Sequence, residues 1–183
     1  MSTSAKEKRQ QQLIEIIETD PFVTDEVLSE KLKVSIQTIR LDRMALAIPE
    51  LRIRIKDVAR NNYDKVRTLK KSEIVGELID LDLNQQGISL LQTDETMAFE
   101  RTKIIKGHYI FAMAESLALA VIDARVAITG VANLKYAVPV KAGEQLKAKA
   151  KVTMIRGKEY FVHVFITVKD QPVFRSKFIL KTL

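Results

Sequence analysis

Polar side chains with the chemistry of DNA reading are grouped between positions 35 and 40 of the chain. Ser35, Gln37, Thr38 and Arg40 carry hydroxyl, amide and guanidinium groups. Such groups hydrogen-bond to base edges in the major groove and to backbone phosphates. Ser35 is also a favourable N-cap residue, so it predicts a helix that begins directly after it. The first turn of that helix would present these side chains to a duplex.

The other residues of this segment predict how the helix packs. Ile36, Ile39 and the region of Leu41 and Met44 can face a small core, whereas Asp42 and Arg43 remain outside together with the polar residues. A solvated amphipathic helix without any ligand is the alternative for this segment taken alone. The flanking elements decide between the two interpretations.

Two further helices are expected upstream. Residues 5–18 contain helix formers without Gly or Pro, and Asp20-Pro21 ends that helix. Thr24 is an N-cap candidate for a second helix that runs to residue 32, and Lys33-Val34 forms a short turn before the third. Three helices with a tight turn between the last two predict a helix-turn-helix domain over residues 1–48. A generic three-helix bundle is the alternative.

A linker is expected over residues 49–70. A helix over residues 50–68 follows Pro49, which is tolerated in the first turn of a helix. Its narrow apolar stripe would pack against the same helix of a second chain or against its own subunit. Its basic residues either reach the DNA backbone or keep the helix solvated; they are Arg52, Arg54, Lys56 and Arg60.

Composition limits the possible environments and partners. The 183 residues are 46% hydrophobic, contain no cysteine and carry a net charge of +7. Without a long apolar run or a signal-peptide core, a cytoplasmic protein is expected. Residues 1–69 have 13 Lys and Arg against 11 Asp and Glu, and the remainder has 17 against 12. The excess downstream suggests a second anionic ligand.

The segment from residue 71 to 183 predicts a second domain. Strand-like patterns cover residues 76–83 and 86–91, and an almost wholly apolar helix covers 110–122. Four strand-like runs follow, separated by turn residues. This α+β order, with an antiparallel meander after a central helix, matches the hot-dog fold. Hot-dog domains commonly form dimers.

Few residues of this domain could do catalysis. No metal-ligand spacing, phosphate-binding loop or nucleotide-type glycine motif occurs, and no cofactor is expected. His163, in an apolar strand, is expected to be structural. Glu115, in the central helix, either pairs with a cation such as Lys106 or serves a ligand. Because hot-dog thioesterases use such a carboxylate, a thioesterase with a DNA-binding head is the alternative function.

Four segments resemble the FapR family of repressors of bacterial fatty-acid and phospholipid synthesis. They are Pro21 to Glu26, Val34 to Arg43, Ile48 to Arg52 and Lys106 to Ala112. The resemblance implies a homodimer that binds an inverted-repeat operator through its helix-turn-helix domains. It also implies that malonyl-CoA, or a related acyl-CoA, binds the hot-dog domain and releases the DNA. The candidate DNA contacts are Ser35, Gln37, Thr38, Arg40, Leu41, Arg43 and Arg52.

Two positions differ from the family pattern in the effector domain. Lys106-Gly107-His108 stands where the family has Arg-Gly-His, and Ala114-Glu115-Ser116 stands where it has Ala-Asn-Ser. In the family, that Arg pairs with the malonyl carboxylate and that Asn helps to hold the malonyl end. A lysine keeps the charge but loses the bidentate geometry, and an ionised glutamate repels a carboxylate. The candidate effector-binding residues are Phe99, Lys106, Gly107, His108, Glu115 and Ile128.

Overall fold

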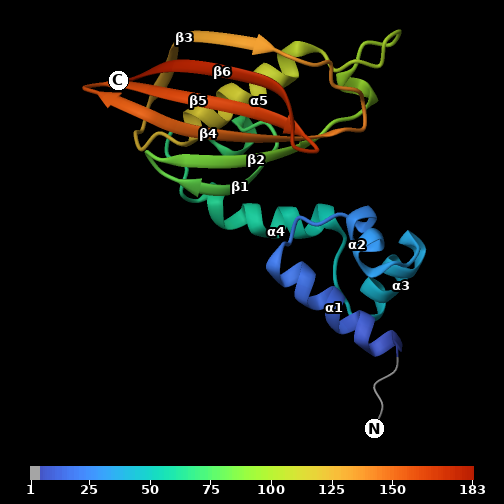
Figure 1. Cartoon of the computed structure of the whole chain (residues 1–183). Helices are drawn as coiled ribbons and strands as arrows, with labels where there is room; N and C mark the ends of the chain where they lie inside the picture. Colours follow the sequence, from blue (N-terminus) through green and yellow to red (C-terminus); the bar gives the residue numbers. More distant parts are fainter. Residues whose placement is uncertain (1–4) are drawn as a thin grey trace. The chain divides into compact units, whose positions relative to one another are not determined.

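The computed structural model describes residues 5–183, except for the side chains of residues 58 and 61. Residues 1–4 of the expected first domain lie outside this range. The described chain divides into two compact units, and the boundary between them in the sequence follows Val58 (Figure 1). The first unit contains helices only, and the second contains a six-stranded sheet and its helix.

Three helices build the first unit, as expected. They are α1 (Ala5–Thr19), α2 (Asp25–Leu32) and α3 (Ile36–Ala45). The Thr24 hydroxyl caps α2 by accepting from the Val27 amide, and the Ser35 hydroxyl caps α3 by accepting from the Thr38 amide. Lys33 ends α2 in the left-handed conformation, with φ 54°, and thereby turns the chain toward α3. Both N-cap predictions are confirmed.

A small apolar core holds these helices together. Leu13 and Ile17 of α1, Leu28 of α2 and Ile39 of α3 are buried with Val23 from the connecting loop. The i, i+4 spacing of Leu13 and Ile17 places both on one face of α1. These five residues make the apolar contacts among the three helices, and they leave Ser35 and Gln37 at the start of α3 exposed.

The linker helix is shorter than expected. Helix α4 is Leu51–Tyr63, whereas the sequence pattern predicted a helix to residue 68. The Tyr63 hydroxyl donates to the Gly76 carbonyl at 3.1 Å and accepts from the Leu78 amide at 3.3 Å. These contacts tie the end of α4 to the chain entering the sheet, and the helix stops there. A short 3-10 turn, η1 (Lys71–Glu73), precedes the first strand.

The second unit is one antiparallel sheet in the order β1-β2-β4-β5-β6-β3. The strands are β1 (Glu77–Asp82), β2 (Gln86–Gln92), β3 (Ala127–Tyr136), β4 (Gln145–Arg156), β5 (Glu159–Val168) and β6 (Gln171–Thr182), and a 3-10 turn, η2 (Glu95–Met97), follows β2. The expectation of a simple meander of the last four strands is wrong for β3. This strand crosses to the far edge of the sheet and pairs with β6.

Helix α5 (Gly107–Ala120) packs against the inner face of this sheet (Figure 1). Met113, Ala114, Leu117 and Ala118 are fully buried among side chains of the strands. Alanines on the helix let the sheet approach closely, and alternate residues of β4, β5 and β6 complete the core. This α+β arrangement is the hot-dog fold, as expected. Among residues 5–183, no helix has both the length and the apolar content to cross a bilayer.

Candidate nucleic-acid interface and ligand pocket

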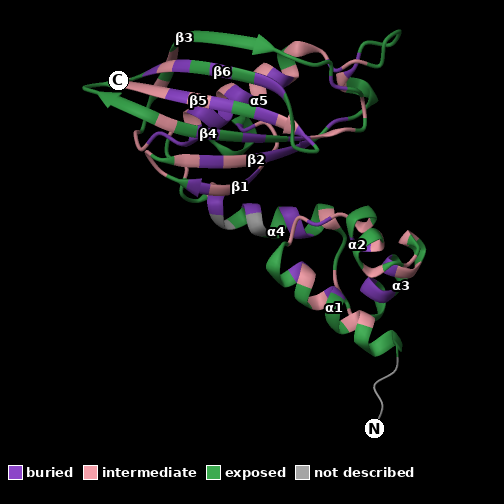
Figure 2. Cartoon of the chain, in the orientation of Figure 1, coloured by how far each residue is buried: buried purple, intermediate pink, exposed green. Residues whose placement is uncertain are grey.

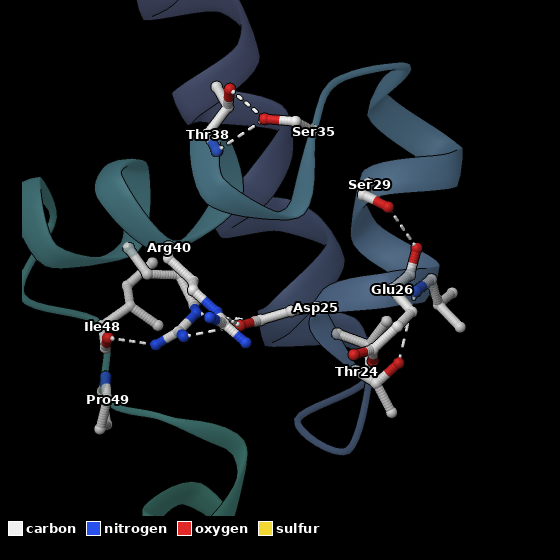
Figure 3. A network of polar contacts seen from close by, with 12 residues as sticks. Thr24, Asp25, Glu26, Ser29, Ser35, Thr38, Arg40, Ile48 and Pro49 are labelled. Carbon is white, nitrogen blue, oxygen red and sulfur yellow. Dashed lines mark hydrogen bonds and ion pairs between the residues drawn. The ribbon is translucent and has the colours of Figure 1, made fainter.

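The first turn of α3 has the geometry expected of a recognition helix. The Ser35 hydroxyl accepts from the Thr38 amide at 3.1 Å, and the two hydroxyls share a further hydrogen bond of 2.9 Å (Figure 3). Gln37 and Arg40 are exposed beyond this cap. Thr38 is half-buried and holds the cap as well as facing outward. Ser35, Gln37, Thr38 and Arg40 therefore lie together at one helix end.

Arg40 is accessible and only loosely held. Its guanidinium Nε lies 3.7 Å from an Asp25 carboxylate oxygen, and its side chain keeps 58% of its exposure (Figure 3). An ion pair of this length and exposure contributes little to stability. Arg40 can therefore leave Asp25 for an anionic or acceptor group of a ligand at small cost.

Arg43 does not face solvent, so its expected exposure is wrong. Its side chain is 7% exposed and forms a bidentate pair with Asp25, at 2.9 Å from Nε and 2.8 Å from Nη2. Arg43 follows the core residue Ile39 by four positions, which places both on the inner face of α3. It joins α3 to α2 through this pair. The spacing from Ile39 was the signal that could have shown this.

Asp42 is likewise buried, contrary to expectation. Its carboxylate accepts from Arg9 Nε at 2.6 Å and from the Gln10 amide at 2.9 Å, and both donors come from α1. The hydrogen bond from Arg9 is the largest reason why the pKa of Asp42 lies below its usual value. Asp42 thus fastens α3 to α1.

Leu41 and Met44 are not core residues, because their exposed fractions are 58% and 76%. Met44 lines a surface hollow of about 670 Å³ within the first unit, together with Arg40 and Arg52. The structure thus brings Arg40 and the start of α4 to one hollow. Leu41 is exposed on α3 but does not line it.

Arg54 is a structural residue that the sequence pattern placed on the outside of α4. Its side chain donates to three backbone carbonyls, those of Pro21 at 3.0 Å, Val23 at 2.8 Å and Pro49 at 2.8 Å. Burial lowers the pKa of Arg54. It closes the first unit around the start of α4, whereas Arg52, Lys56 and Arg60 remain exposed.

In the second unit, a pocket of about 320 Å³ lies beside the N-terminus of α5. Gly107 begins the helix, and the Tyr136 hydroxyl donates to the Gly107 carbonyl at 2.9 Å. A Cβ added at Gly107 would stand 3.0 Å from the Tyr136 hydroxyl oxygen and 3.1 Å from Cζ, so glycine permits this close approach. Ile104, Ile110 and Val138 supply apolar walls. The pocket combines apolar surface with the amide-rich end of a helix.

Only some of the expected effector-binding residues gather at this pocket. Gly107 lines it, and Lys106 and His108 flank Gly107 in the chain. Phe99 is 53% exposed on the preceding loop, where its amide donates to the carbonyl of the pocket residue Ile104 at 2.9 Å. Ile128, by contrast, is near the opposite end of β3 from Tyr136, about 26 Å away at 3.3 Å per residue.

Glu115 lies further along α5 and is half-buried. Nine residues of helix separate it from Lys106, which is about 13 Å at 1.5 Å per residue. Within residues 5–183 the two side chains form no ion pair, so the pairing alternative is not realised. The carboxylate is available to a ligand or to solvent.

Comparison with known proteins agrees with both units. Residues 9–61 match the family described as the DeoR-like helix-turn-helix domain. The transcription factor FapR of Thermoanaerobacter sp. strain X514 is 58% identical over 96% of this chain and 88% of its own length. The chain belongs to the FapR family. The FapR of Bacillus velezensis is 46% identical over 95% of this chain and 94% of its own length.

Solved structures resemble the sheet unit of this FapR-family chain. The uncharacterized protein PH1136 from Pyrococcus horikoshii has a TM-score of 0.60 and 28% identity, covering 64% of this chain and 91% of that one. The Escherichia coli PaaI protein has a TM-score of 0.53 and 15% identity, covering 57% of this chain and 80% of its own. The second likeness concerns the fold alone. A FapR-family chain thus joins a helix-turn-helix head to a hot-dog body.

Proposed function

We propose that this protein is a homodimeric, cytoplasmic repressor of fatty-acid and phospholipid synthesis genes, which malonyl-CoA or a related acyl-CoA releases from an inverted-repeat operator. The observation that carries the proposal is the presence in one FapR-family chain of an accessible α3 and of a pocket at the α5 N-terminus. Helix α3 can read a DNA sequence, and the pocket can accept a ligand that changes the affinity of the protein for DNA.

Direct base contacts are assigned to Gln37 and Arg40, which are exposed on the first turns of α3. Arg40 can donate bidentately to guanine, and the Gln37 amide suits adenine. Contacts with the DNA backbone around these bases are assigned to Ser35, Leu41 and Arg52. Arg43 is withdrawn from the contacts, because its guanidinium is committed to Asp25.

The homodimer is supported by strand β3 at the edge of the sheet. Its residues are exposed along most of their length (Figure 2), and Val131, Leu134 and Tyr136 retain 51%, 37% and 46% of their exposure. An exposed apolar edge strand is a template for pairing with another chain. Antiparallel pairing of two β3 strands about a two-fold axis buries this edge and also favours a two-fold symmetric operator.

The same pairing explains why Ile128 is far from the pocket of its own chain. In an antiparallel pair centred near Ala132, the beginning of one β3 lies opposite the end of the other. Ile128 of one protomer would then approach Tyr136 of its partner, which lines the pocket. We therefore assign the effector site to the dimer, with Phe99, Lys106, Gly107 and His108 from one protomer and Ile128 from the other. Glu115 faces the interior part of the ligand.

Acyl-CoA binding can alter DNA affinity only if it favours the DNA-free arrangement. Helix α4 is the means of coupling, because the boundary between the two units lies within it, after Val58. To convert a protein population that is about 99% in the DNA-binding arrangement to one that is about 1% in it, the ligand must prefer the DNA-free arrangement about 10⁴-fold.

Mobility shift with a palindromic promoter fragment tests the proposal. We expect a shifted complex that malonyl-CoA dissolves, with acetyl-CoA and longer acyl-CoAs as comparisons. If the protein shifts no such fragment, it is not the proposed repressor. If no acyl-CoA dissolves the complex, acyl-CoA is not its effector.

The same acyl-CoA panel tests the thioesterase alternative, for which Glu115 is the candidate carboxylate. We expect the protein to release free CoA no faster than the Glu115→Gln variant does. Release that depends on Glu115 would establish the enzyme instead.

A further inference from the structure

The outer face of the sheet carries a basic hollow that the proposed repressor function does not use. Alternate residues of β4, β5 and β6 point away from α5, so Lys149, Lys151, Arg175 and Lys177 are exposed between buried neighbours. Between β3, β5 and β6 the surface forms a hollow of about 270 Å³. Its lining includes Asn133, Lys135, His163, Phe165, Arg175 and Lys177.

Strand register shows how the charges are arranged. One cross-strand row contains Gln86, Lys151, His163, Lys177 and Asn133. The next row contains Ile88, Lys149, Phe165, Arg175 and Lys135. Directly opposed residues have Cβ atoms about 4.5–5.5 Å apart. From β2 to β3 neither row contains a carboxylate; the rows end in Asp82 and Asp80 on β1, at the opposite edge of the sheet from the hollow. Within the described residues none of the lysines and arginines of the two rows forms an ion pair.

Such an array is unfavourable for the protein alone, because like charges on adjacent strands repel. The basic surroundings affect His163, because burial and the nearby positive charge of Lys177 lower the pKa of its imidazole. Bringing an anion into the hollow relieves the repulsion and satisfies the donors.

The non-charged residues narrow the chemistry of the ligand. Phe165 is 52% exposed in the middle of the second row, and the imidazole of His163 lies in the neighbouring row. Aromatic faces at an exposed basic site can stack a nucleobase. Arginine and lysine bind phosphate groups, the arginine bidentately. A hollow of about 270 Å³ admits part of a small ligand, whereas a DNA duplex is too wide to enter it.

We propose that this hollow binds a nucleoside polyphosphate. Its base stacks on Phe165, and its phosphates lie against Lys135, Arg175 and Lys177. The same chemistry belongs to free nucleotides and to the nucleotide end of CoA. The site is separate from the apolar pocket at the α5 N-terminus, which is lined by other residues.

Calorimetry with the full-length protein tests the site with ATP, inorganic pyrophosphate, CoA and a duplex without an operator. We expect ATP to bind more tightly than pyrophosphate, because only ATP can stack on Phe165. In nuclear magnetic resonance spectra, ATP should raise the pKa of His163 and shift the Phe165 ring signals. If CoA produces the same His163 shift, CoA is one source of the nucleotide; if only ATP does so, the ligand is a free nucleotide.

Variants locate the binding. Arg175→Gln should weaken ATP binding roughly 10- to 100-fold, which corresponds to one charge-assisted hydrogen bond. Lys158→Gln, at an exposed turn outside the hollow, is the matched control and should leave the affinity unchanged. The proposal is overturned if ATP leaves His163 unaffected, if pyrophosphate binds as tightly as ATP, or if Arg175→Gln binds ATP normally. It is equally overturned if the duplex alone perturbs His163.

Discussion

Arg40, Arg43 and Arg54 are close in sequence but have three different environments. Arg40 is exposed and held only by a 3.7 Å contact with Asp25. Arg43 is locked to the same carboxylate by two short hydrogen bonds, and Arg54 donates to three carbonyls. We therefore propose that Arg40 is the arginine that contacts DNA, whereas Arg43 and Arg54 hold together the helices that present it.

Arg40→Ala should lose operator affinity without loss of stability. A bidentate contact between arginine and guanine is worth about 1–3 kcal/mol, so binding should weaken by about 5- to 150-fold. Mobility shift measures this, and thermal unfolding should be close to that of the original protein. If Arg40→Ala retains full affinity for the operator, Arg40 does not read DNA.

Arg43→Ala is the contrasting variant. It leaves Asp25 without its main partner, and breaking a buried pair costs about 3 kcal/mol at the lower end of the usual range, where the partial exposure of Asp25 places it. Urea denaturation should show this loss of unfolding free energy. A variant as stable as the original protein would contradict the structural role of Arg43.

The buried pair of Asp42 and Arg9 makes stability depend on pH. The folded-state pKa of Asp42 is below its usual value, chiefly because Arg9 donates to it. Its contribution is therefore complete above the unfolded pKa of about 3.9 and disappears as pH falls through the lower folded pKa. Asp42→Asn should flatten the loss of unfolding free energy below about pH 4, as urea titrations at several pH values can measure. Asp94→Asn, at an exposed turn, gives a comparison at the surface.

Lys106→Arg combined with Glu115→Asn should strengthen malonyl-CoA binding. The arginine restores a bidentate donor, and the asparagine removes a charge that repels the malonyl carboxylate. Calorimetry with malonyl-CoA and acetyl-CoA should show the gain for malonyl-CoA alone. Equal gains for both ligands would mean that these residues do not read the acyl carboxylate.

Sequence reasoning succeeded where the determining contact is local. The capping hydroxyls of Thr24 and Ser35 bond within their own helix turn. The burial of Asp42 depends on Arg9, which is 33 positions away, and no periodicity of α3 alone shows that donor. Charged residues are ordinarily exposed, so their burial becomes visible only when the packed helices supply partners.

At the scale of elements, β3 is the more exposed of the two edge strands of the sheet. It pairs with β6 on one side, and its other edge is open in the sheet order. Its place was not predictable from the alternation of its residues, because alternation identifies a strand but not its neighbour. The chain order favoured β4, whereas the strand crosses to the end of the sheet.

Val131→Arg with Leu134→Arg should convert the proposed dimer to a monomer. Two charges at the centre of the β3 edge would be desolvated by pairing, without any acidic partner. Analytical ultracentrifugation measures the mass. Ile155→Arg is the matched control, since Ile155 has a similar exposure of 48% but lies on β4. A dimer that survives the double substitution does not use β3.

At the scale of the molecule, α4 has residues in both units, and its last residue is Tyr63. The Tyr63 hydroxyl accepts from the Leu78 amide, and its single proton is shared between two acceptors, the Gly76 carbonyl and the Glu77 carboxylate. Burial is the main reason why its pKa is raised to about 12, so it stays protonated at any physiological pH. It can therefore act as a fixed anchor for the helix.

Tyr63→Phe should loosen this anchor. We expect a loss of unfolding free energy of about 1–2 kcal/mol, together with a smaller difference between operator affinities with and without malonyl-CoA. Tyr160→Phe, at a half-buried tyrosine on β5, is the control. If the effect of malonyl-CoA on DNA affinity is unchanged in Tyr63→Phe, the coupling does not depend on this end of α4.

The crossing of β3 has a consequence for biosynthesis. Within residues 5–183, β3 pairs in the sheet with β6 alone, which follows β4 and β5 in the chain, and the Leu183 amide donates to the Val126 carbonyl. During synthesis β3 therefore has no strand to pair with until β6 has left the ribosome, whereas the helices of the first unit precede β3 in the chain and make local contacts. Under the proposed pairing of two β3 strands, the first unit of each chain can fold before the surface for dimer formation exists, and dimer assembly follows the pairing of β3 with β6.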